Sequence, residues 1–385
     1  DELGAWESII SDDASEPDIS ISPEDIAILQ YTGGTTGVLK GCCQTNHAFV
    51  AKAMAQVQYF RPFLNDNDYE NYMVIIALGM SHAFGFGQGI VVNLTMGGTI
   101  FFAESLDEIL RVIEKYRPTV WPSVPLWMKL IATHEEYQKY DISSLKVITC
   151  GSAPLPVDVI RRVEELTGAV ITEGYGMTET VNTITINGHD HRKVGTVGVV
   201  NPNIEYLIVD QETGTEVVED GQPGEIICRG ECVMHEYWNN PEETAKMLRN
   251  GWLYTGDIGR IDEEGFLIIC DRKKDLIITG GFNVFPSELE AVAITAENVA
   301  DAIAIGVPNE RRGEVPAIFV QPIAGKTVDL NEVERVCREK LSRFKVPKEY
   351  YIMDMLPKTK NRKPDRKMVK KLYLEHAFDD QKKEQ

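Results

Sequence analysis

The sequence predicts an α/β protein with a large domain, in which mostly parallel sheets are flanked by helices and joined by a β-rich subdomain, and a small α+β C-terminal domain. Apolar strands alternate with helical periodicity between residues 72 and 172, which is typical of parallel sheets. Over 194–270 the pattern changes to short alternating strands with frequent turns, which indicates an antiparallel β region. Five consecutive charges at 271–275 then precede a shorter series of helices and strands. We therefore predict a large domain over 1–273 and a small domain over 274–385.

The individual elements follow from periodicity and flanking turns. Residues 1–25 are polar and acidic and predict a tail or linker, and the last ten residues predict a frayed end. Residues 25–31 predict a strand that runs into a glycine-rich loop, and the continuous apolar run at 72–78 predicts a strand buried on both faces. The other expected strands are 98–103, 118–121, 146–150, 169–172, 301–307 and 315–321, and the expected helices are 46–55, 105–116, 125–134, 156–167, 286–296 and 329–341.

Composition excludes several classes of function. The 385 residues include 39 Lys and Arg against 59 Asp and Glu, a formal net charge of −20. A surface this acidic repels nucleic acid and anionic lipid, so an anionic substrate would need a local positive pocket. The most apolar stretch, 89–102, is too short and too often interrupted to span a membrane, and the acidic opening segment lacks the apolar core of a signal peptide. Seven scattered cysteines suit a reducing cytoplasm better than a disulfide framework.

The sharpest local signal is the glycine- and threonine-rich segment from Tyr31 to Gly41. Its glycines let the backbone turn tightly, and its hydroxyls and Lys40 supply donors and positive charge, a combination that cradles phosphates. Because Gly41 follows the lysine where Ser or Thr would be needed, the segment is not a Walker A loop. A plain flexible turn is the alternative, and the coincidence of these residue types directly after a strand argues against it.

A second segment, 173–180, also follows an expected strand. Tyr175 offers an aromatic face, Thr178 a hydroxyl, and Glu179 a carboxylate of the kind that Mg²⁺ prefers. Taken alone, the segment indicates a carboxylate suited to a magnesium ion beside an aromatic face.

Three further segments carry weaker signals. The small-residue loop 151–155 would let a flat ligand approach a sheet crevice, although an ordinary βα turn explains it better when it is taken alone. Asp257, in an expected tight turn flanked by glycines, could accept two hydrogen bonds from a ribose diol or cap its own turn. The basic cluster at 356–366 would, without the other motifs, be a solvated surface loop.

Taken in order, these segments resemble the adenylate-forming superfamily, which includes acyl-CoA synthetases, luciferases and peptide-synthetase adenylation domains. The resemblance runs from about Asp25 to Arg366 and rests on at least six ordered motifs. The catalytic residues that it implies are Lys363, Lys40, Thr178, Glu179 and His82, with Glu179 also the metal ligand. The cofactor-binding residues that it implies are Thr32, Gly33, Gly34, Thr35, Thr36, Gly37, Gly151, Ser152, Ala153, Glu173, Gly174, Tyr175, Gly176, Met177, Asp257, Arg272, Lys274, Gly280 and Gly281.

The resemblance implies a two-step reaction on a small carboxylic acid, fatty or aromatic, with ATP and Mg²⁺ as cofactors and coenzyme A as co-substrate. The carboxylate would attack the α-phosphate of ATP to give acyl-AMP and pyrophosphate, and the thiol would then take the acyl group. Lys363 would stabilise charge on the α-phosphate, a contribution of about 2.7–4 kcal/mol for one well-placed donor. Asp257 would bind the ribose and Arg272 the nucleotide, while the mobile small domain would rotate about Lys274 between the steps. The resemblance leaves a homodimer open.

Two other functions stay open at this point: a stand-alone adenylation enzyme that loads a carrier protein, and a non-catalytic nucleotide-binding fragment. Within 78–86, His82 would lie near the substrate carboxylate, although a histidine satisfied at a helix start fits the spacing nearly as well. The same segment has no acidic residue, which favours an acid without an α-amino group because an unpaired buried ammonium is costly.

The chain departs from the family pattern at several positions. Leu39 and Gly79 stand where the family has Pro, and Arg362 stands where it has Gly beside the catalytic lysine. None of these changes removes a reactive group. Only about thirty residues precede the phosphate loop, where the family has a long section, so we expect a fragment or a chain that lacks its N-terminal part.

Overall fold

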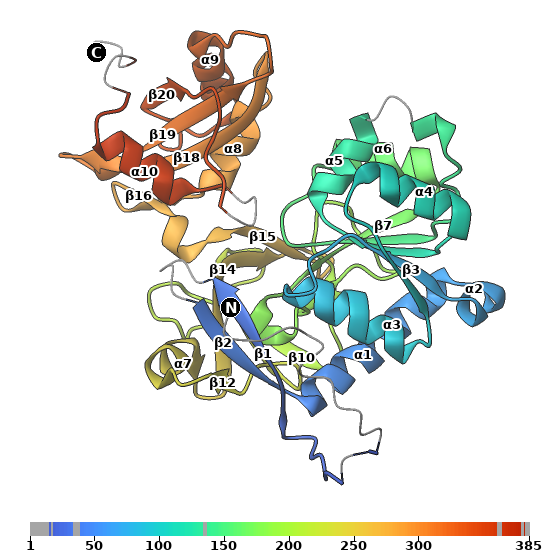
Figure 1. Ribbon diagram of the computed structural model, residues 1–385. Helices are drawn as coiled ribbons and strands as arrows, with labels where there is room; N and C mark the ends of the chain where they lie inside the picture. The colour runs from blue at the N-terminus through green and yellow to red at the C-terminus, as the bar shows by residue number, and fades with distance from the viewer. Residues whose placement is uncertain are drawn as a thin grey trace, which may run out of the picture.

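The computed structural model describes residues 15–16, 18–33, 39–133, 137–359, 364–378 and 381. Figure 1 shows a small C-terminal domain, in orange and red, that stands apart from a larger body and joins it beside β15 (Leu267–Arg272). The larger body contains a mostly parallel sheet with helices on both faces and an antiparallel β-rich part. The α/β class expected from the sequence is therefore confirmed.

The main sheet of the large domain has seven strands in the order β4-β3-β5-β6-β7-β8-β9. The first five pair in parallel, and the last two add antiparallel strands at one edge. The central strands β3, β5 and β6 are apolar because both of their faces are buried. The bounds of the seven strands are β3 Met73–Ile76, β4 Thr99–Phe102, β5 Val120–Ser123, β6 Val147–Cys150, β7 Val170–Tyr175, β8 Thr185–Ile186 and β9 Val199–Val200.

Alternate residues of these strands face two different helical layers. Ile75 and its neighbours pack against α4 (Leu106–Tyr116), α5 (Pro125–Thr133) and α6 (Val157–Thr167). Val74 and Ile76 pack with residues of α1 (Asn46–Phe60) and α3 (Val92–Thr95) on the opposite face. Smaller helices complete this part: η2 Arg61–Phe63, α2 Asp66–Glu70, the π-helix η3 Phe84–Val91, η4 Tyr137–Lys139 and η5 Thr178–Thr180.

The glycine-rich loop differs from the expectation in its setting. It connects two antiparallel strands, β1 (Ile26–Gly33) and β2 (Leu39–Thr45), whereas the sequence predicted a strand, a loop and then a helix. The second strand was missed, because Leu-Lys-Gly-Cys-Cys-Gln-Thr has no clear alternation and its strand conformation depends on its partners. A third strand, β12 (Glu236–Tyr237), pairs with the other edge of β2.

The β-rich part, expected over 194–270, has antiparallel strands that end at Arg272. The antiparallel strands β10 (Ile204–Val209), β11 (Gly224–Gly230) and β14 (Trp252–Ile261) are neighbours, and β15 pairs with β14. The short elements α7 (Pro241–Met247) and β13 (Leu248–Arg249) complete it.

The small domain has its own sheet and cores. Strands β17, β16, β19 and β18 are hydrogen-bonded in that order, and β20 pairs in parallel with β19. Helices α8 and α9 cover one face, while α10 covers the other. The bounds are η6 Lys273–Asp275, β16 Ile277–Thr279, β17 Phe282–Val284, α8 Pro286–Ala293, β18 Val299–Asn309, β19 Gly313–Pro322, α9 Leu330–Lys340, β20 Glu349–Ile352 and α10 Arg366–Leu374. The domain boundary at 273/274 stays a prediction.

Two general expectations can be compared with this structure. Among the described residues, no helix combines the length and apolar character needed to cross a bilayer. All seven cysteines are free thiols, and all but Cys270 are buried.

Candidate functional site

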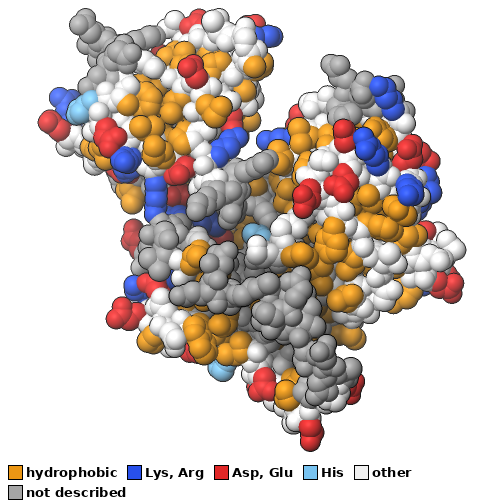
Figure 2. Space-filling model, in the orientation of Figure 1, with side chains coloured by type: hydrophobic (Ala, Val, Ile, Leu, Met, Phe, Trp, Pro, Cys, Tyr) orange, Lys and Arg blue, Asp and Glu red, His pale blue; other side chains and the backbone are white. Residues whose placement is uncertain are grey.

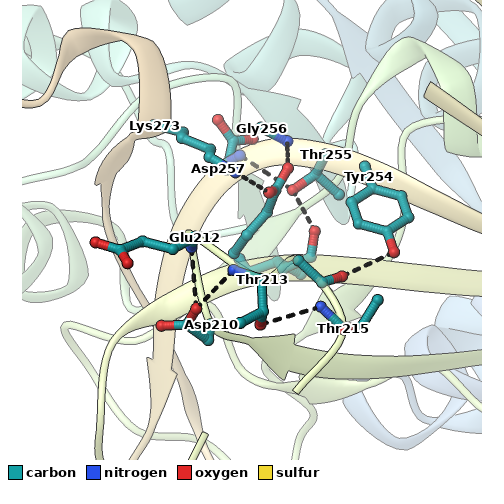
Figure 3. A network of polar contacts seen from close by, with 12 residues as sticks. Asp210, Glu212, Thr213, Thr215, Tyr254, Thr255, Gly256, Asp257 and Lys273 are labelled. Carbon is teal, nitrogen blue, oxygen red and sulfur yellow. Dashed lines mark hydrogen bonds and ion pairs between the residues drawn. The ribbon is translucent and has the colours of Figure 1, made fainter. Parts of the chain in front are cut away.

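Asp257 lies at the centre of the site, within β14 and not in the tight turn expected from the sequence. Between Glu225 and Ile227 the pairing of β11 with β14 shifts register, so β14 bulges at 255–257. Bulges of this kind aim a side chain away from the regular pleat. Gly256 has φ +70°, a conformation that favours glycine, and the Asp257 N–H donates to Thr255 Oγ1 at 3.1 Å. Figure 3 shows Asp257 beside these two residues, with Lys273 nearby.

The Asp257 carboxylate is 6% exposed and is held from two sides. Tyr175 Oη donates to its Oδ2 at 2.7 Å from the end of β7, and Arg272 Nε lies 3.1 Å from its Oδ1 across the β14–β15 pairing. Burial and the adjacent Asp257 charge raise the pKa of Tyr175, so the phenol keeps its proton as a donor. The arrangement presents a fixed carboxylate with a cation beside it, next to the domain junction.

Glu179 forms a second carboxylate position. It is 5% exposed on η5, and its Oε1 accepts a hydrogen bond from Tyr237 Oη at 2.5 Å. Burial raises the pKa of Glu179, and the Tyr237 hydrogen bond and the positive charge of Lys40 oppose that shift. The negative charge of Asp257 also raises this pKa, which places the two carboxylates within electrostatic range of each other.

Lys40 is held beside Glu179 at the start of β2. Its Nζ lies 2.9 Å from Glu243 Oε2 and 4.7 Å from the centroid of the Tyr237 ring. Hydrogen bonds from Lys246 and from Lys40 lower the pKa of Glu243 to about 2, so Lys40 faces an ionised partner. Tyr237 and Glu243 were missed by the sequence analysis, because nothing local marks a two-residue strand and a helix start that lie about 200 residues from Lys40.

The segment after β7 is fixed by its neighbours. Glu173, Gly174 and Tyr175 lie within β7, whereas the sequence placed them in a loop after the strand. A Cβ on Gly176 would lie 2.4 Å from the carbonyl carbon of Asn182, so a side chain cannot fit there. The half-buried Thr178 offers its backbone oxygen to the Gln44 amide of β2, which ties this segment to the hairpin. Met177 is half-buried beside it.

The phosphate loop is described only at its ends. Thr32 and Gly33 end β1, and Thr32 pairs with Lys40. Gly34, Thr35, Thr36 and Gly37 lie outside the described residues. The assignment of this loop to phosphate binding therefore remains a prediction, supported by the position of Lys40 beside Glu179.

The small-residue loop 151–155 follows β6. Gly151 is half-buried, and a Cβ at this position would meet the Phe84 ring at 3.6 Å and Gly174 O at 3.8 Å. Ser152 and Ala153 are exposed, and Ser152 has φ +72°. The loop thus lies beside β7, as expected for neighbouring parallel strands.

His82 hydrogen-bonds the start of a helix, which is one of the two interpretations that the sequence left open. Its Nδ1 accepts a hydrogen bond from the Phe84 N–H at 3.1 Å, so it satisfies the start of η3. The Gln30 amide donates to the neighbouring Ser81 carbonyl, which fixes this segment against β1. A contact between His82 and a substrate carboxylate stays a prediction.

The junction between the domains is basic. Figure 2 shows Lys and Arg side chains where the small domain meets the large one. Arg272 is exposed, and burial together with the Arg272 charge lowers the pKa of Lys274. Gly280 and Gly281 form the turn between β16 and β17 with φ +58° and +83°. Lys363 lies outside the described residues.

The residues on either side of 360–363, which lie outside the described residues, are connected by hydrogen bonds. Lys358 and Pro364 form a β-bridge, and the Asp365 N–H donates to Pro357 O at 2.9 Å. Arg366 Nη2 lies 2.7 Å from both oxygens of Glu290 on α8, which anchors the start of α10. The described ends of the basic cluster, 356–359 and 364–366, are thus anchored to the small domain.

The donor set fits a nucleotide with a bound magnesium ion. Mg²⁺ is usually held by one or two carboxylates together with phosphate oxygens and waters, and Glu179 offers one such carboxylate. Among the described residues, no group of three or more His, Cys, Asp or Glu side chains could hold a metal ion by itself. The residues present therefore suit an ion that arrives with phosphate.

Comparison with known proteins decides the family. Residues 2–238 match the AMP-binding enzyme family, and residues 288–363 match the AMP-binding enzyme C-terminal domain. The chain belongs to the AMP-binding enzyme family. The adenylate-forming resemblance inferred from the motifs is thereby confirmed.

The relatives of this AMP-binding chain include several acyl-CoA ligases. It is 38% identical over 343 residues to a long-chain-fatty-acid–CoA ligase of Bacillus subtilis, covering 88% of this chain and 60% of that protein. It is 32% identical over 369 residues to 4-coumarate-CoA ligase 1 of Narcissus pseudonarcissus, covering 94% of this chain and 67% of that ligase. The chain thus spans about three fifths of the length of the fatty-acid ligases it matches.

Solved structures give the same family. The ATP-bound MatB from Rhodopseudomonas palustris superposes with a TM-score of 0.81 at 32% identity, covering 92% of this chain and 69% of that one. The o-succinylbenzoate CoA synthetase of Bacillus subtilis, in complex with its acyl-adenylate intermediate, gives 0.80 at 29% identity, covering 91% and 70%. Both were solved with nucleotide-type ligands.

Proposed function

We propose that this chain is the part of an ATP-dependent acid–thiol ligase that activates a carboxylic acid as acyl-AMP and transfers the acyl group to coenzyme A. The observation that carries the proposal is the arrangement of Asp257, held by Tyr175 and Arg272, within electrostatic range of Glu179 and Lys40. A carboxylate for a ribose, a carboxylate for a metal and a lysine for phosphate are the groups that bind ATP for adenylyl transfer. The names of the acyl-CoA ligase relatives support the choice of reaction.

In the first step, the acid and ATP are both anionic, so the site must offset charge. Asp257 would accept hydrogen bonds from the ribose hydroxyls, and Arg272 beside it would contact the nucleotide. Lys40 would exchange its contact with Glu243 for the leaving phosphates. Mg²⁺, held by Glu179, would neutralise the phosphate oxygens. Lys363 would stabilise charge on the α-phosphate, and such preorganised donors supply the largest share of catalysis in reactions of this kind.

In the second step, the thiol displaces AMP, which leaves readily. We propose that the small domain rotates about Lys274 between the two steps, so that the glycine turn at 280–281 replaces Lys363 at the site. We place the protein in the cytoplasm, which its seven free thiols support. A homodimer remains part of the proposal, to be checked by sizing in solution.

A panel of carboxylic acids tests the proposal directly. Acid-dependent pyrophosphate release, followed by AMP release that requires coenzyme A, is the expected result. AMP release that requires a carrier-protein thiol would change the acceptor but keep the first step. ATP binding without pyrophosphate release for any acid would leave only a non-catalytic nucleotide-binding fragment.

A further inference from the structure

Lys52, on α1, is a buried cation outside the groups assigned so far. Among the charged residues that the structure describes, four are buried: Lys52, Glu179, Glu225 and Asp257. Each of the three carboxylates has a phenol or a cation as its partner, which for Glu225 is Lys273. Lys52 is 0% exposed, and no carboxylate lies within ion-pair distance of it among the described residues. Its charge is therefore not explained by an ion pair.

The Lys52 side chain is held by one short segment. Its Nζ donates to Val181 O at 2.7 Å and to Thr183 Oγ1 at 2.9 Å. Burial lowers the pKa of Lys52 to about 7, and the neutral amine that forms above this pH still has two N–H donors for the same two acceptors. A buried ammonium is costly, and an apolar side chain of similar volume is often tolerated as well or better. The contacts with 181–183 are what a lysine supplies here and an apolar residue would not.

The segment 176–183 is a closed loop that carries Glu179. The Ile184 N–H donates to Tyr175 O at 2.7 Å, which joins the two ends of the loop. Glu179 lies within the loop on η5, and its carboxylate is the proposed metal ligand. Tyr175, at the base of the loop, donates to Asp257. A change in the shape of the loop would therefore move the groups proposed to bind the metal and the ribose.

The returning half of the loop has a backbone conformation that needs support. Val181 and Asn182 have φ +47° and +67°, in the left-handed region. Asparagine adopts this region fairly readily, whereas a β-branched residue such as valine does so rarely. Such backbone persists where the surrounding structure holds it. Lys52 donates on both sides of Asn182, to Val181 O and to the Thr183 hydroxyl, and thus supplies that support.

The end of the Lys52 side chain also lies against η3. A Cβ on Gly87 would be 3.3 Å from Lys52 Cε, 3.5 Å from its Nζ and 3.5 Å from Val181 O. The glycine therefore leaves the space that the amine occupies between η3 and the loop. Through Lys52, the helix α1, the π-helix η3 and the loop 176–183 meet at one point.

We infer that Lys52 is a positioning residue for the adenylation step, whose N–H bonds hold the loop 176–183 in the shape that presents Glu179 to the metal bound with ATP. The inference rests on the proposed function. Lys52 has no exposed surface with which to contact the nucleotide or the acid, so it acts through the loop. Removing its amine should weaken metal-dependent ATP binding and also remove the cost of a buried charge. Binding and stability should therefore move in opposite directions.

Lys52→Met removes the donors and keeps an unbranched side chain of similar shape. Titration calorimetry measures the Kd for ATP, without acid, in Mg²⁺ and again in EDTA. We expect Mg²⁺ to tighten ATP binding to the unaltered protein, and Lys52→Met to lose about tenfold of that tightening, the value of one charge-assisted contact. In EDTA the two proteins should agree within about threefold. The midpoint of urea unfolding should stay the same or rise in Lys52→Met.

Thr183 provides a second pair of variants, which decides the question if Lys52→Met does not fold. Thr183→Val removes the hydroxyl that accepts from Lys52, and Thr183→Ser keeps it. We expect Thr183→Val to lose part of the Mg²⁺-dependent tightening, about threefold to tenfold, and Thr183→Ser to retain it.

Arg192→Met is the matched control. Arg192 Nε donates to Ile171 O at 2.8 Å, so it is a cation that holds the backbone of β7 at the end opposite Tyr175. Arg192→Met should lower the urea midpoint and leave the effect of Mg²⁺ on ATP binding unchanged.

The outcomes are distinct. An equal effect of Mg²⁺ on Lys52→Met and on the unaltered protein would overturn the inference and leave the ligase function in place. Weaker ATP binding that is the same in Mg²⁺ and in EDTA, or that accompanies a lower urea midpoint, would overturn it too, because Lys52 would then act only in the fold. Equal behaviour of Thr183→Val and Thr183→Ser leads to the same conclusion, as does an unaltered protein whose ATP binding is not tightened by Mg²⁺. Absence of pyrophosphate release from the unaltered protein with every acid would refute the proposed function itself, and this inference with it.

Discussion

Replacing Asp257 by Asn separates the structural role of this carboxylate from its proposed role in nucleotide binding. In the structure it accepts the Tyr175 hydrogen bond at 2.7 Å and faces Arg272 at 3.1 Å. Asparagine keeps the shape and can still accept from Tyr175, so a charge-assisted hydrogen bond becomes a neutral one, a loss of about 1–2 kcal/mol. The ion pair adds little to this loss, because the Arg272 side chain is half exposed.

The effect on ATP should be larger. If two ribose hydroxyls donate to this carboxylate, the amide loses charge and turns a donor toward one of them, which costs about 1.5–3 kcal/mol. That corresponds to a rise of roughly 10- to 100-fold in the KM for ATP. Acid-dependent exchange of labelled pyrophosphate into ATP measures the KM, and urea unfolding measures the stability.

Glu164→Gln is the matched control. Glu164 pairs with Arg192 at 2.6 Å and accepts the Ile171 N–H at 2.9 Å, so it loses a similar charged interaction at the opposite end of β7. It should lose about 1–2 kcal/mol of stability while its KM for ATP stays within about threefold of the original. If Asp257→Asn also lost stability but kept its KM, Asp257 would be a structural residue and the ribose assignment would be wrong.

Four further outcomes follow, three from burial and contacts in the structure and one from the proposed role of Lys363. Tyr237→Phe removes a hydrogen bond that lowers the pKa of Glu179, so the acidic limb of the pH–rate profile should move to higher pH, and an unmoved limb would exclude Glu179 as the ionised metal ligand. Burial raises the pKa of Glu173 from 4.5 to about 7. The stability that the protonated carboxyl contributes, about 3 kcal/mol at most, is therefore fully present below about pH 4.5 and is lost as pH rises through 7. In urea unfolding, Glu173→Gln should lack this fall of unfolding free energy with pH. Arg366→Met leaves a buried carboxylate unpaired and should destabilise the protein by about 3–5 kcal/mol in urea unfolding, slowing acyl-AMP formation more than thioester formation, and equal slowing would contradict a local effect. Lys363→Ala should abolish acyl-AMP formation but largely spare thioester formation from prepared acyl-AMP, and normal activation of the acid would refute its proposed role.

The parallel sheet could be predicted because each of its strands carries its own signal. The run Met-Val-Ile-Ile of β3 is buried on both faces, and α4 presents Ile109, Leu110 and Ile113 to the core at helical spacing. Such patterns depend only on neighbours in the chain. The hairpin strand β2 has no such pattern, and its conformation is set by pairing with β1 and β12. Strands of that kind are determined by tertiary context, which periodicity does not record.

The position of Asp257 could not be predicted for a related reason. The sequence Tyr-Thr-Gly-Asp suggests a tight turn, whereas the structure continues the strand through a bulge whose existence depends on the register with β11. The motif indicated Asp257 as a candidate, which stays a prediction, and the geometry that aims its side chain depends on the register with β11. Glycine in a strand interior is a sign of a bulge, and Gly256 could have indicated one.

The two halves of the proposed site therefore differ in how far the sequence can predict them. In the proposed site, phosphate and ribose would be bound by short segments of fixed backbone shape, so motifs alone make residues such as Lys40 and Glu179 candidates. A cavity beside these segments is lined by residues of α1, β6 and β7; α1 lies far from both strands in the chain, and the three elements meet only in the fold. No local pattern marks Gln56, a buried glutamine within the mostly buried helix α1. That Gln56 lines one cavity with Thr149 and Thr172 is visible only in the structure, because tertiary packing and not a local pattern brings α1 to the ends of β6 and β7.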